Sequence, residues 1–392
     1  MTRAILTLNS GSSSLKLGLF TEALETMALA HVDRIGRREA AMKIRDAHGA
    51  DLPMPPHAPA DFNTNAAALR TALEVFAQDF PGLEVVAVGH RIVHGGKSHA
   101  APVRLTEELM KDLARLAAFA PLHQPHNLAG VRAAVETFPG VPNIACFDTA
   151  FHRGHPFVAD AYALPRAYYE RGIRRYGFHG LSYEFIAGEL AQSAPALHAG
   201  RVVVAHLGSG ASMCAIQGGR SMDSTMGFSA IDGLPMGTRT GQLDPGVLLY
   251  LMDEEGLDSA AISDLLYKDS GLLGLSGISN DMRTLEGSAA PEAEEAIAYF
   301  TYRIRREIGA MAAAMGGIDG LVFCGGIGEN SARVRARVCE GLGWLGVGID
   351  PQANLAHARE IGTGAVRVMV IQTNEEIVIA RAAAAVLQGL AA

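Results

Sequence analysis

Cysteine, positive charge and long apolar stretches are all scarce in this chain of 392 residues. The four cysteines lack the spacing of metal ligands, so buried free thiols in a reducing cytosol are expected. Lysine and arginine total 33 against 41 aspartate and glutamate, giving a formal net charge of −8, which argues against a nucleic-acid or anionic-membrane surface. No run of about 20 apolar residues occurs, so no membrane span is predicted. The first residues lack the apolar stretch of a signal peptide, so we expect a cytoplasmic protein.

Glycine, in contrast, is abundant, with 44 residues, and 49% of the chain is hydrophobic. This composition provides material for large cores and, at this length, for two or three domains. Much of the glycine stands in short clusters beside apolar runs, which favours binding loops lined by backbone groups over flexible linkers. If such loops bind anions in a chain of net negative charge, the positive field must be local, from a few Arg, His and helix N-termini.

The two halves of the chain repeat one pattern, in which a strand, a Gly/Ser turn and a second strand are followed later by an apolar strand that enters a Gly-rich loop. The segments are residues 4–8, 15–19 and 85–96 in the first half and residues 202–207, 213–216 and 320–330 in the second. We interpret this as a duplicated α/β domain with an active-site cleft between the copies. A coincidence of spacing is the alternative.

Helices are predicted between these segments. Thr106 is a candidate N-cap before an acidic first turn, and the helical spacing continues to Phe119 before Pro121 ends it. Residues 291–315 and 375–390 predict two further helices, and residues 47–60, which are rich in Pro, predict an exposed loop.

The two Gly/Ser turns could each direct several backbone N–H groups and hydroxyls at one point, as phosphate-binding nests do. Ordinary hairpin turns are the alternative for each turn alone. Arg91 and Arg239 both lie in Gly-rich loops, Arg91 directly after an apolar strand. A guanidinium so placed suits bidentate contact with carboxylate or phosphate, although a solvated surface arginine is the alternative.

Three histidines lie in or beside loops that contain Gly or Pro: His123, His179 and His206. They lack paired ligand spacing, so we favour hydrogen-bond donation to phosphoryl oxygens over transition-metal ligation. Asp148 stands where an apolar strand ends, and Glu375 opens the last helix. Mg²⁺ that binds with a nucleotide usually takes only one or two carboxylates from the protein, and these two residues could supply them. The alternative for Glu375 is a helix N-terminal acid.

Taken in order, the motifs resemble those of the acetate kinase family, within the larger group of actin-like, sugar-kinase-like and Hsp70-like ATPases. They are residues 8–16, 89–96, 121–123, 147–152, 175–180, 236–241, 326–330 and 373–376. The resemblance implies an α/β fold of two duplicated ribonuclease-H-like, actin-like ATPase domains with a central cleft. The expected domains are residues 1–150, completed by the C-terminal helix 376–392, and residues 151–375 on the nucleotide side.

The resemblance also implies roles for individual residues. The residues implied in catalysis are Asp148, Arg91, Arg239, His179 and His123, with the two arginines clamping the carboxylate and the transferring phosphoryl group. The implied metal ligands are Asn9, Glu375 and Asp148. The candidate walls of the acid pocket, beside Arg91, are Val93, Leu122 and Pro235. The implied phosphate turns contain Asn9, Ser10, Ser12 and Lys16 in the first half and His206, Gly208, Ser209 and Gly210 in the second. The implied nucleotide-side positions are Asp281, Met282, Arg283, Gly326, Ile327, Gly328 and Asn330.

Four positions depart from the family's usual residues: Ser209 replaces Asn, Gln242 replaces Asp, Leu181 replaces Thr, and Tyr183 replaces His. These changes touch phosphate positioning and catalytic rate, and they leave the two arginines unchanged.

The implied reaction is reversible transfer of the ATP γ-phosphoryl group to acetate, giving acetyl phosphate and ADP. ATP/ADP and Mg²⁺, with Mn²⁺ as a substitute, are the expected cofactors, and a homodimer is expected. A carboxylic acid with a pKa near ~4 is already ionised at neutral pH, so direct in-line transfer needs no general base. The alternatives are a propionate or butyrate kinase, a phosphohydrolase of the same superfamily, or a non-enzymatic ATP-binding protein.

Overall fold

The computed structural model describes residues 2–11, 14–54, 58–121 and 123–389. Its backbone divides into two compact units: one comprises the chain up to Phe151 together with the chain from Asn374 on, and the other is His152–Thr373. The second domain had been predicted to end at Glu375, but Asn374 and Glu375 cluster with the first unit. Asn374 accepts a hydrogen bond from the Ile377 N–H as the N-cap of the last helix, and that helix packs on the first sheet, so these residues follow it.

The first unit is built on a seven-stranded sheet of order β4-β3-β2-β1-β5-β7-β6. Its strands are β1 (Thr2–Ser10), β2 (Ser14–Thr21), β3 (Thr26–Asp33), β4 (Ala41–Asp46), β5 (Leu83–Ile92), β6 (Val103–Arg104) and β7 (Asn143–Phe147). Strands β1 to β4 form an antiparallel meander, while β1, β5 and β7 run parallel. The carboxyl ends of these three parallel strands therefore share one edge of the sheet.

The second unit is built on a five-stranded sheet of order β10-β9-β8-β11-β12. Its strands are β8 (Arg201–Leu207), β9 (Ala211–Gln217), β10 (Arg220–Ser224), β11 (Gly320–Cys324) and β12 (Arg367–Val370). Strands β8 to β10 are antiparallel, and β8, β11 and β12 are parallel. The five central strands of the first sheet, β3-β2-β1-β5-β7, correspond in order to the whole second sheet, β10-β9-β8-β11-β12, so the duplicated α/β fold is confirmed.

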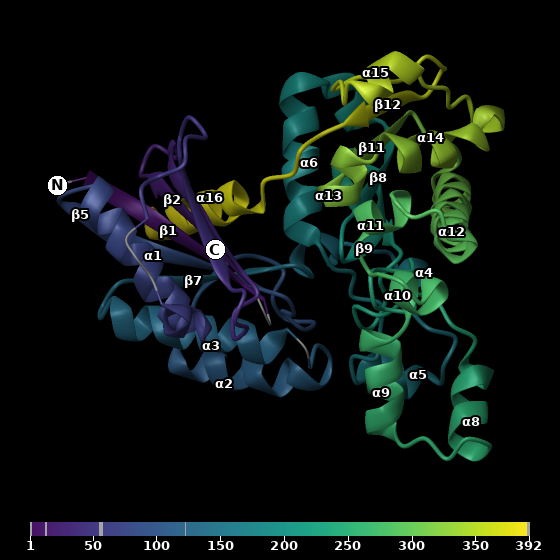
Figure 1. Cartoon of the computed structure of the whole chain (residues 1–392). Coiled ribbons are helices and arrows are strands. Elements are labelled where there is room, and N and C mark those ends of the chain that lie inside the picture. Colours follow the sequence, from purple (N-terminus) through teal and green to yellow (C-terminus); the bar gives the residue numbers. More distant parts are fainter. Residues whose placement is uncertain (1, 12–13, 55–57, 122, 390–392) are drawn as a thin grey trace. The chain divides into compact units, whose positions relative to one another are not determined.

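Helices cover both faces of the first sheet. The helical segments of this unit are η1 (Pro59–Phe62), α1 (Asn65–Asp79), α2 (Glu107–Arg115), η2 (Leu116–Ala118), α3 (Gln124–Thr137) and α16 (Glu375–Leu387), with η3 (Ala150–His152) at the boundary. Val88 packs into a core that includes residues of α1 and α3, whereas a Cβ at the next residue, Gly89, would lie 2.5 Å from Ile379 of α16. Successive strand residues face opposite sides, so α16 covers the other face, as Figure 1 shows.

The second unit is richer in helices. They are α4 (Phe157–Asp160), α5 (Arg166–Glu170), α6 (Gly180–Ser193), α7 (Pro195–Ala199), α8 (Pro245–Asp253), α9 (Ser259–Lys268), α10 (Gly271–Ser276), α11 (Met282–Glu286), α12 (Pro291–Met315), α13 (Gly325–Asn330), α14 (Ala332–Glu340), η4 (Gly343–Leu345) and α15 (Pro351–Leu355). The long helix α12 packs on strands β8 to β10 (Figure 1). Phe300 and Ile304 on this helix are fully buried.

The predicted local structure is mostly confirmed. Thr106 caps α2 by accepting from the Leu109 N–H, and helix 291–315 has the predicted bounds. The expected continuation of α2 is wrong beyond Arg115, where the chain tightens into η2. The last helix ends at Leu387, before the predicted 390. The loop predicted after β11 is wrong, because residues 325–330 form the short helix α13.

The four cysteines are buried free thiols, as predicted. Burial raises the pKa of the Cys214 thiol well above its ordinary value and that of Cys339 to about 12, so both stay protonated. Within the part of the chain that the structure describes, no helix combines the length and apolar character needed to span a membrane.

Candidate active site

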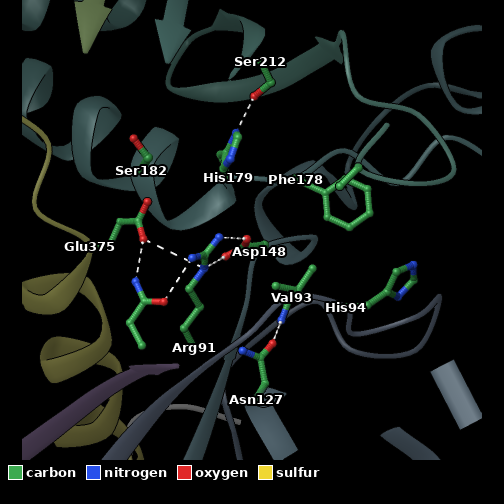
Figure 2. A network of polar contacts seen from close by, with 12 residues as sticks. Arg91, Val93, His94, Asn127, Asp148, Phe178, His179, Ser182, Ser212 and Glu375 are labelled. Atoms are coloured by element: carbon green, nitrogen blue, oxygen red, sulfur yellow. Dashed lines mark hydrogen bonds and ion pairs between the residues drawn. The ribbon is translucent and has the colours of Figure 1, made fainter. Parts of the chain in front are cut away.

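Arg91 and Asp148 meet at the carboxyl edge of the first sheet. Strands β5 and β7 are parallel neighbours that pair Arg91 with Cys146, so Asp148, the residue after β7, ends beside the guanidinium. Arg91 Nε donates to Asp148 Oδ1 at 2.9 Å, and Nη2 donates to Oδ2 at 2.7 Å. Figure 2 shows this two-pronged contact. Such bidentate pairing fixes the plane of the guanidinium as well as its position.

Asn9 and Glu375 complete this cluster. Asn9 lies near the end of β1, which is parallel to β5, and its Oδ1 accepts from Arg91 Nη1 at 3.0 Å. Its Nδ2 donates to Glu375 Oε2 at 3.1 Å, and that oxygen lies 3.9 Å from Arg91 Nε. Four predicted site residues, separated by up to 366 positions in the sequence, are thus brought into one hydrogen-bonded group. We call Asn9, Arg91, Asp148 and Glu375 the arginine cluster.

The arginine cluster keeps the Arg91 guanidinium positively charged. Burial alone would lower the pKa of Arg91, but the charges of Asp148 and then Glu375 outweigh it and raise that pKa above its ordinary value. Arg91 therefore stays charged at any physiological pH. Its side chain keeps 20% of its surface exposed, while that of Asp148 keeps 1%, so the guanidinium still presents surface to a ligand and the carboxylate lies behind it.

The donor set of the arginine cluster suits a hard cation such as Mg²⁺, which prefers carboxylate and amide oxygens. A second observation agrees with this fit. Glu376 Oε1 is buried, and the described residues offer it no hydrogen-bond partner. Burial raises the pKa of Glu376, Lys16 acts in the opposite direction, and Glu375 adds to the rise. Lys16 is the cross-strand partner of Asn9, so the first hairpin places a lysine next to a member of the arginine cluster.

The other predicted residues of the first unit have separate positions. His123 is the N-cap residue of α3, in the same unit as Arg91, while its predicted companion His179 belongs to the second unit. Val93 is buried next to β5, and its N–H donates to Asn127 Oδ1 at 2.9 Å. Ser10 Oγ is buried beneath α3, where a Cβ at Gly130 would lie 2.5 Å away. Ser12 and Leu122 lie outside the described residues.

The second unit contains a stacked pair of histidines. His179 and His206 have ring centroids 4.3 Å apart at an interplanar angle of 23°. His179 Nδ1 lies 2.8 Å from Ser212 Oγ (Figure 2), and His206 Nδ1 lies 2.8 Å from Ser182 Oγ. His179 has φ of +55°, a left-handed conformation that costs energy for a residue with a side chain, so the fold holds it there for its ring position.

Both rings turn their other nitrogen toward the turn between β8 and β9. A Cβ at Gly210 would lie 3.2 Å from His179 Nε2 and 2.9 Å from Arg239 Nη2, and one at Gly208 would lie 4.0 Å from His206 Nε2. Arg239 is anchored by Nη1, which donates to the Ala230 carbonyl at 2.7 Å. Any side chain at Gly210 would fill the space that these donors face. We call His179, His206, Arg239 and the turn 208–210 the histidine cluster.

The histidine cluster is suited to an anion with several oxygens. Two imidazolium charges 4.3 Å apart would repel by about 4 kcal/mol at an effective dielectric constant near 20, so the stacked pair favours at least one neutral ring. A neutral ring with its proton on Nε2 donates a hydrogen bond without adding charge. The single fixed cation of the cluster is then Arg239.

Predicted nucleotide-side residues surround the same turn. The Gly237 N–H donates to the Ser209 carbonyl, and a Cβ at Gly237 would lie 3.1 Å from the Asn280 carbonyl, so residues just before α11 approach the turn. On the other side, the Gly326 N lies 3.8 Å from the Cβ position of Gly208. Gly325, which precedes it, has φ of +77° and would clash with the Leu207 carbonyl if it carried a Cβ. The sharp entry into α13 therefore depends on glycine.

The remaining residues of this group make local contacts. Asp281 caps α11 and pairs with Arg283 through Nε at 3.1 Å and Nη2 at 2.6 Å, both exposed, while Met282 is buried. Asn330 Nδ2 donates to the Gly326 carbonyl within α13, which also contains Ile327 and Gly328. Pro235 is buried in the second unit. Gln242 Oε1 accepts from Arg303 Nη2 at 2.6 Å, so the departure from Asp provides a neutral partner for a buried arginine.

Sequence reasoning missed the hydroxyl groups that hold the histidines. Ser212 and Ser182 bond the two rings, Tyr183 Oη lies 2.5 Å from Ser212 Oγ, and Thr373 Oγ1 lies 2.8 Å from Ser182 Oγ. One signal was available: β9 begins directly after the turn, so Ser212 must stand opposite His206 on the neighbouring strand. Nothing in the sequence links Thr373 to Ser182, 191 positions away.

The model of the Acetokinase family matches residues 4–381, nearly the whole chain. At full coverage of both chains, the sequence is 53% identical to a protein named acetate kinase from Methylocella silvestris. The chain belongs to the acetokinase family. This membership accounts for the arrangement of the motifs and agrees with the resemblance inferred from them.

Solved structures extend this comparison. The crystal structure of Porphyromonas gingivalis acetate kinase is similar with a TM-score of 0.85 at 37% identity, and the comparison covers 98% of this chain and 100% of that one. A propionate kinase from Francisella tularensis is similar with a TM-score of 0.88 at 33% identity, over 97% and 98% of the two chains. The two solved structures, one an acetate kinase and one a propionate kinase, are thus similar to this chain at comparable TM-scores.

Proposed function

We propose that this chain is an acetate kinase, a phosphotransferase that moves the γ-phosphoryl group of ATP to acetate, giving acetyl phosphate and ADP, and that also runs the reverse reaction. One observation carries the choice of a carboxyl acceptor. Both oxygens of Asp148 accept hydrogen bonds from Arg91. An acid committed to a guanidinium is poorly placed to take a proton from a hydroxyl or from water, and a carboxylate substrate arrives without a proton to lose.

The chemical difficulty is then the approach of two anions. Arg91, oriented by Asp148, would neutralise the carboxylate as it reaches phosphorus. Arg239 and the Nε2–H groups of the stacked histidines would receive the equatorial oxygens of the transferring phosphoryl group, on which charge spreads in the transition state. The backbone groups of the turn 208–210 would hold the phosphates of the nucleotide. These residues position the two substrates and neutralise their negative charges, and none of them is required to exchange a proton.

Mg²⁺ is the proposed metal cofactor, with Mn²⁺ as a substitute. Asn9 and Glu375 would hold it, with Asp148 fixing the neighbouring arginine, and the buried Glu376 oxygen supports a cation in this region. When bound, the metal supplies positive charge to the phosphate oxygens. The nucleotide-side proposal comprises Asp281, Met282, Arg283, Gly326, Ile327, Gly328 and Asn330. His123 is proposed as a further donor.

Acetate is proposed over propionate. The proposed walls of the acid pocket are Val93, Leu122 and Pro235. An apolar pocket discriminates between acids differing by one CH₂ by only about 1–3 kcal/mol, so propionate should be accepted more weakly. Equal or better kcat/KM for propionate or butyrate would overturn the acetate assignment and leave the kinase assignment intact.

Trapping with hydroxylamine tests the proposal, since an acyl phosphate reacts to a coloured hydroxamate. We expect hydroxamate only when enzyme, ATP, Mg²⁺ and acetate are all present. ADP release without acetate at the same rate would indicate a phosphohydrolase. Nucleotide binding with neither hydroxamate nor ADP release would indicate a non-enzymatic ATP-binding protein.

We also propose a homodimer located in the cytoplasm. Helix α8 buries none of its residues, and it exposes between 40% and 61% of Val247, Leu249, Tyr250 and Met252. Val247 and Tyr250 lie on one side of this nine-residue helix and Leu249 and Met252 on another, so the helix exposes apolar surface of the kind that marks protein interfaces. Leu249→Glu should shift the mass measured by light scattering from two chains to one. The four unpaired thiols fit a reducing compartment.

A further inference from the structure

Tyr183 lies at the end of a hydrogen-bond chain that reaches His179. Its hydroxyl is 2.5 Å from Ser212 Oγ, and that oxygen is 2.8 Å from His179 Nδ1. Tyr183 and Ser212 are both fully buried, with no exposed surface. The tyrosine ring is also held from the side, because His152 packs against it edge to face at 5.6 Å. The chain is therefore rigid and shielded from water, which could otherwise replace either hydroxyl.

The direction of donation along this chain decides where the His179 proton resides. Burial, followed by the influence of Cys214, raises the pKa of Tyr183 well above its ordinary value, so the phenol keeps its proton. A phenol is a more acidic donor than an aliphatic alcohol, so Tyr183 donates to Ser212 Oγ. Among the described residues Ser212 Oγ bonds Tyr183 and His179, so the buried Ser212 O–H finds its acceptor at His179 Nδ1. His179 consequently carries its proton on Nε2.

That nitrogen is the one that faces the turn. His179 Nε2 lies 3.2 Å from the Cβ position of Gly210, beside Arg239 Nη2. With the proton on Nε2, the ring presents a donor to an anion there. With the proton on Nδ1, Nε2 would present a lone pair, which repels an anion. The hydroxyl group at position 183 thus controls the sign of the interaction that His179 Nε2 offers at the turn.

A parallel chain serves the second ring. Thr373 Oγ1 is 2.8 Å from Ser182 Oγ, which is 2.8 Å from His206 Nδ1. In both chains a second hydroxyl stands behind the serine that bonds the imidazole. The repetition of this hydroxyl–serine–histidine order indicates that setting the protonated nitrogen is a property of the cluster rather than an accident at one ring.

We propose that Tyr183 is a positioning residue that, through Ser212, fixes His179 in the tautomer protonated on Nε2 and so makes it a donor toward the turn 208–210. The expected effect on catalysis rests on the proposed function. The position of the proton on His179 does not depend on it.

Tyr183→Phe removes only the hydroxyl and tests the proposal. Because one hydrogen-bonding partner is lost, kcat for hydroxamate formation should fall about 10-fold, while KM for ATP changes little. ¹⁵N NMR of histidine-labelled enzyme, with the signal assigned by His179→Gln, should show His179 protonated on Nε2 in the wild type and a mixture of tautomers in Tyr183→Phe. Tyr176→Phe is the matched control, since it removes another buried hydroxyl, one that donates to the Gly172 carbonyl. It should leave the His179 signals unchanged.

A double variant separates the chain from a general structural effect. If Tyr183 acts only through Ser212, then Tyr183→Phe should cause no further loss of kcat in a Ser212→Ala background. Independent, multiplying losses would overturn the proposal, as would unchanged His179 signals in Tyr183→Phe. Should Tyr183→Phe not fold, Ser212→Ala alone provides the test, with the same tautomer change expected. A wild-type enzyme that forms no hydroxamate but keeps the Nε2 tautomer would refute the proposed function and leave this assignment standing.

Discussion

The two units share a strand order but carry different chemistry at equivalent positions. In the first hairpin, Asn9 of β1 pairs with Lys16 of β2; in the second, His206 of β8 pairs with Ser212 of β9. In each hairpin this pair is the second-to-last pair of residues before the turn. In the first unit the position contributes to a group of fixed charges around Arg91, and in the second it contributes an imidazole ring beside one arginine. The duplication preserved these two positions, and the side chains there diverged.

This difference suggests a division of labour. The arginine cluster contains buried carboxylates that orient a cation, whereas the histidine cluster contains hydroxyl groups that orient imidazole rings. A charged cluster suits the neutralisation of an incoming carboxylate and the holding of a metal. A cluster of neutral donors suits a phosphoryl group whose charge changes during transfer, because its hydrogen bonds can strengthen in the transition state.

Removing either arginine should have the largest effect. Arg91→Ala and Arg239→Ala should each lower kcat by roughly 10² to 10³, the scale of a lost charge-stabilising donor. If the division of labour holds, Arg91→Ala should also raise KM for acetate, and Arg239→Ala should not. The exposed arginines of the same two sheets, Arg104 and Arg220, provide controls, since their alanine variants should be unchanged. Near-normal turnover in either site variant would refute the clamp.

The two acids of the arginine cluster should respond differently to metal. Asp148 bonds Arg91 with both oxygens, so Asp148→Asn should lower kcat by about 10-fold or more in a way that only partly recovers with excess Mg²⁺. Glu375→Gln should mainly raise the Mg²⁺ concentration needed for half-maximal rate. Titrating both variants with Mg²⁺ distinguishes them, and identical titration curves would contradict separate roles.

Adding one methyl group should disturb only the histidine cluster. Gly210→Ala would place a Cβ 2.9 Å from Arg239 Nη2 and 3.2 Å from His179 Nε2, so kcat should fall about 10-fold as the donors move apart. Gly188→Ala in α6 is the matched control, because its Cβ would meet nothing within 4 Å. That variant should keep its activity and gain up to about 1 kcal/mol in stability. Equal activity in both variants would argue against an anion at the turn.

The last prediction concerns stability in acid and leaves turnover at neutral pH unchanged. Burial lowers the pKa of His90 in the first unit to about 4, and its Nε2 bonds Asn143 Oδ1 at 2.7 Å. In the unfolded chain His90 is protonated near pH 6.5, and in the folded chain only near pH 4. The stability that the neutral, buried His90 allows is therefore fully present above pH 6.5 and is lost as the pH falls toward 4. The full effect is roughly 3 kcal/mol. His155 in the second unit, whose pKa burial also lowers to about 4, should behave likewise.

Chemical denaturation at pH 7 and pH 5 would measure this effect. His90→Gln should reduce the loss of stability between the two pH values. If the first unit loses as much stability in the variant as in the wild type, His90 is not the group responsible.

The sequence was sufficient for the duplicated fold because the repeat of strand, Gly/Ser turn and strand depends on local patterns. Arg91, Asp148 and Glu375 were proposed as site residues because each stands at a strand end or helix start, and Asn9 because the family resemblance implies it. The sequence did not predict that Asp148 would bind Arg91 with both oxygens, nor that Ser182 would bond Thr373, because these contacts join segments that only the folded chain brings together. The helix at residues 325–330 was missed because glycine is a poor helix former, and the positive φ of Gly325 was not visible in the pattern.

The most direct test of the account is to follow the acceptor oxygen. Acetate labelled with ¹⁸O, mixed with ATP, Mg²⁺ and the enzyme, should give acetyl phosphate whose ³¹P signal carries the isotope shift of one ¹⁸O bridging carbon and phosphorus. That result means that a carboxylate oxygen attacked phosphorus directly. An unlabelled bridge, or phosphate that takes its new oxygen from water, would contradict a site built to neutralise two anions.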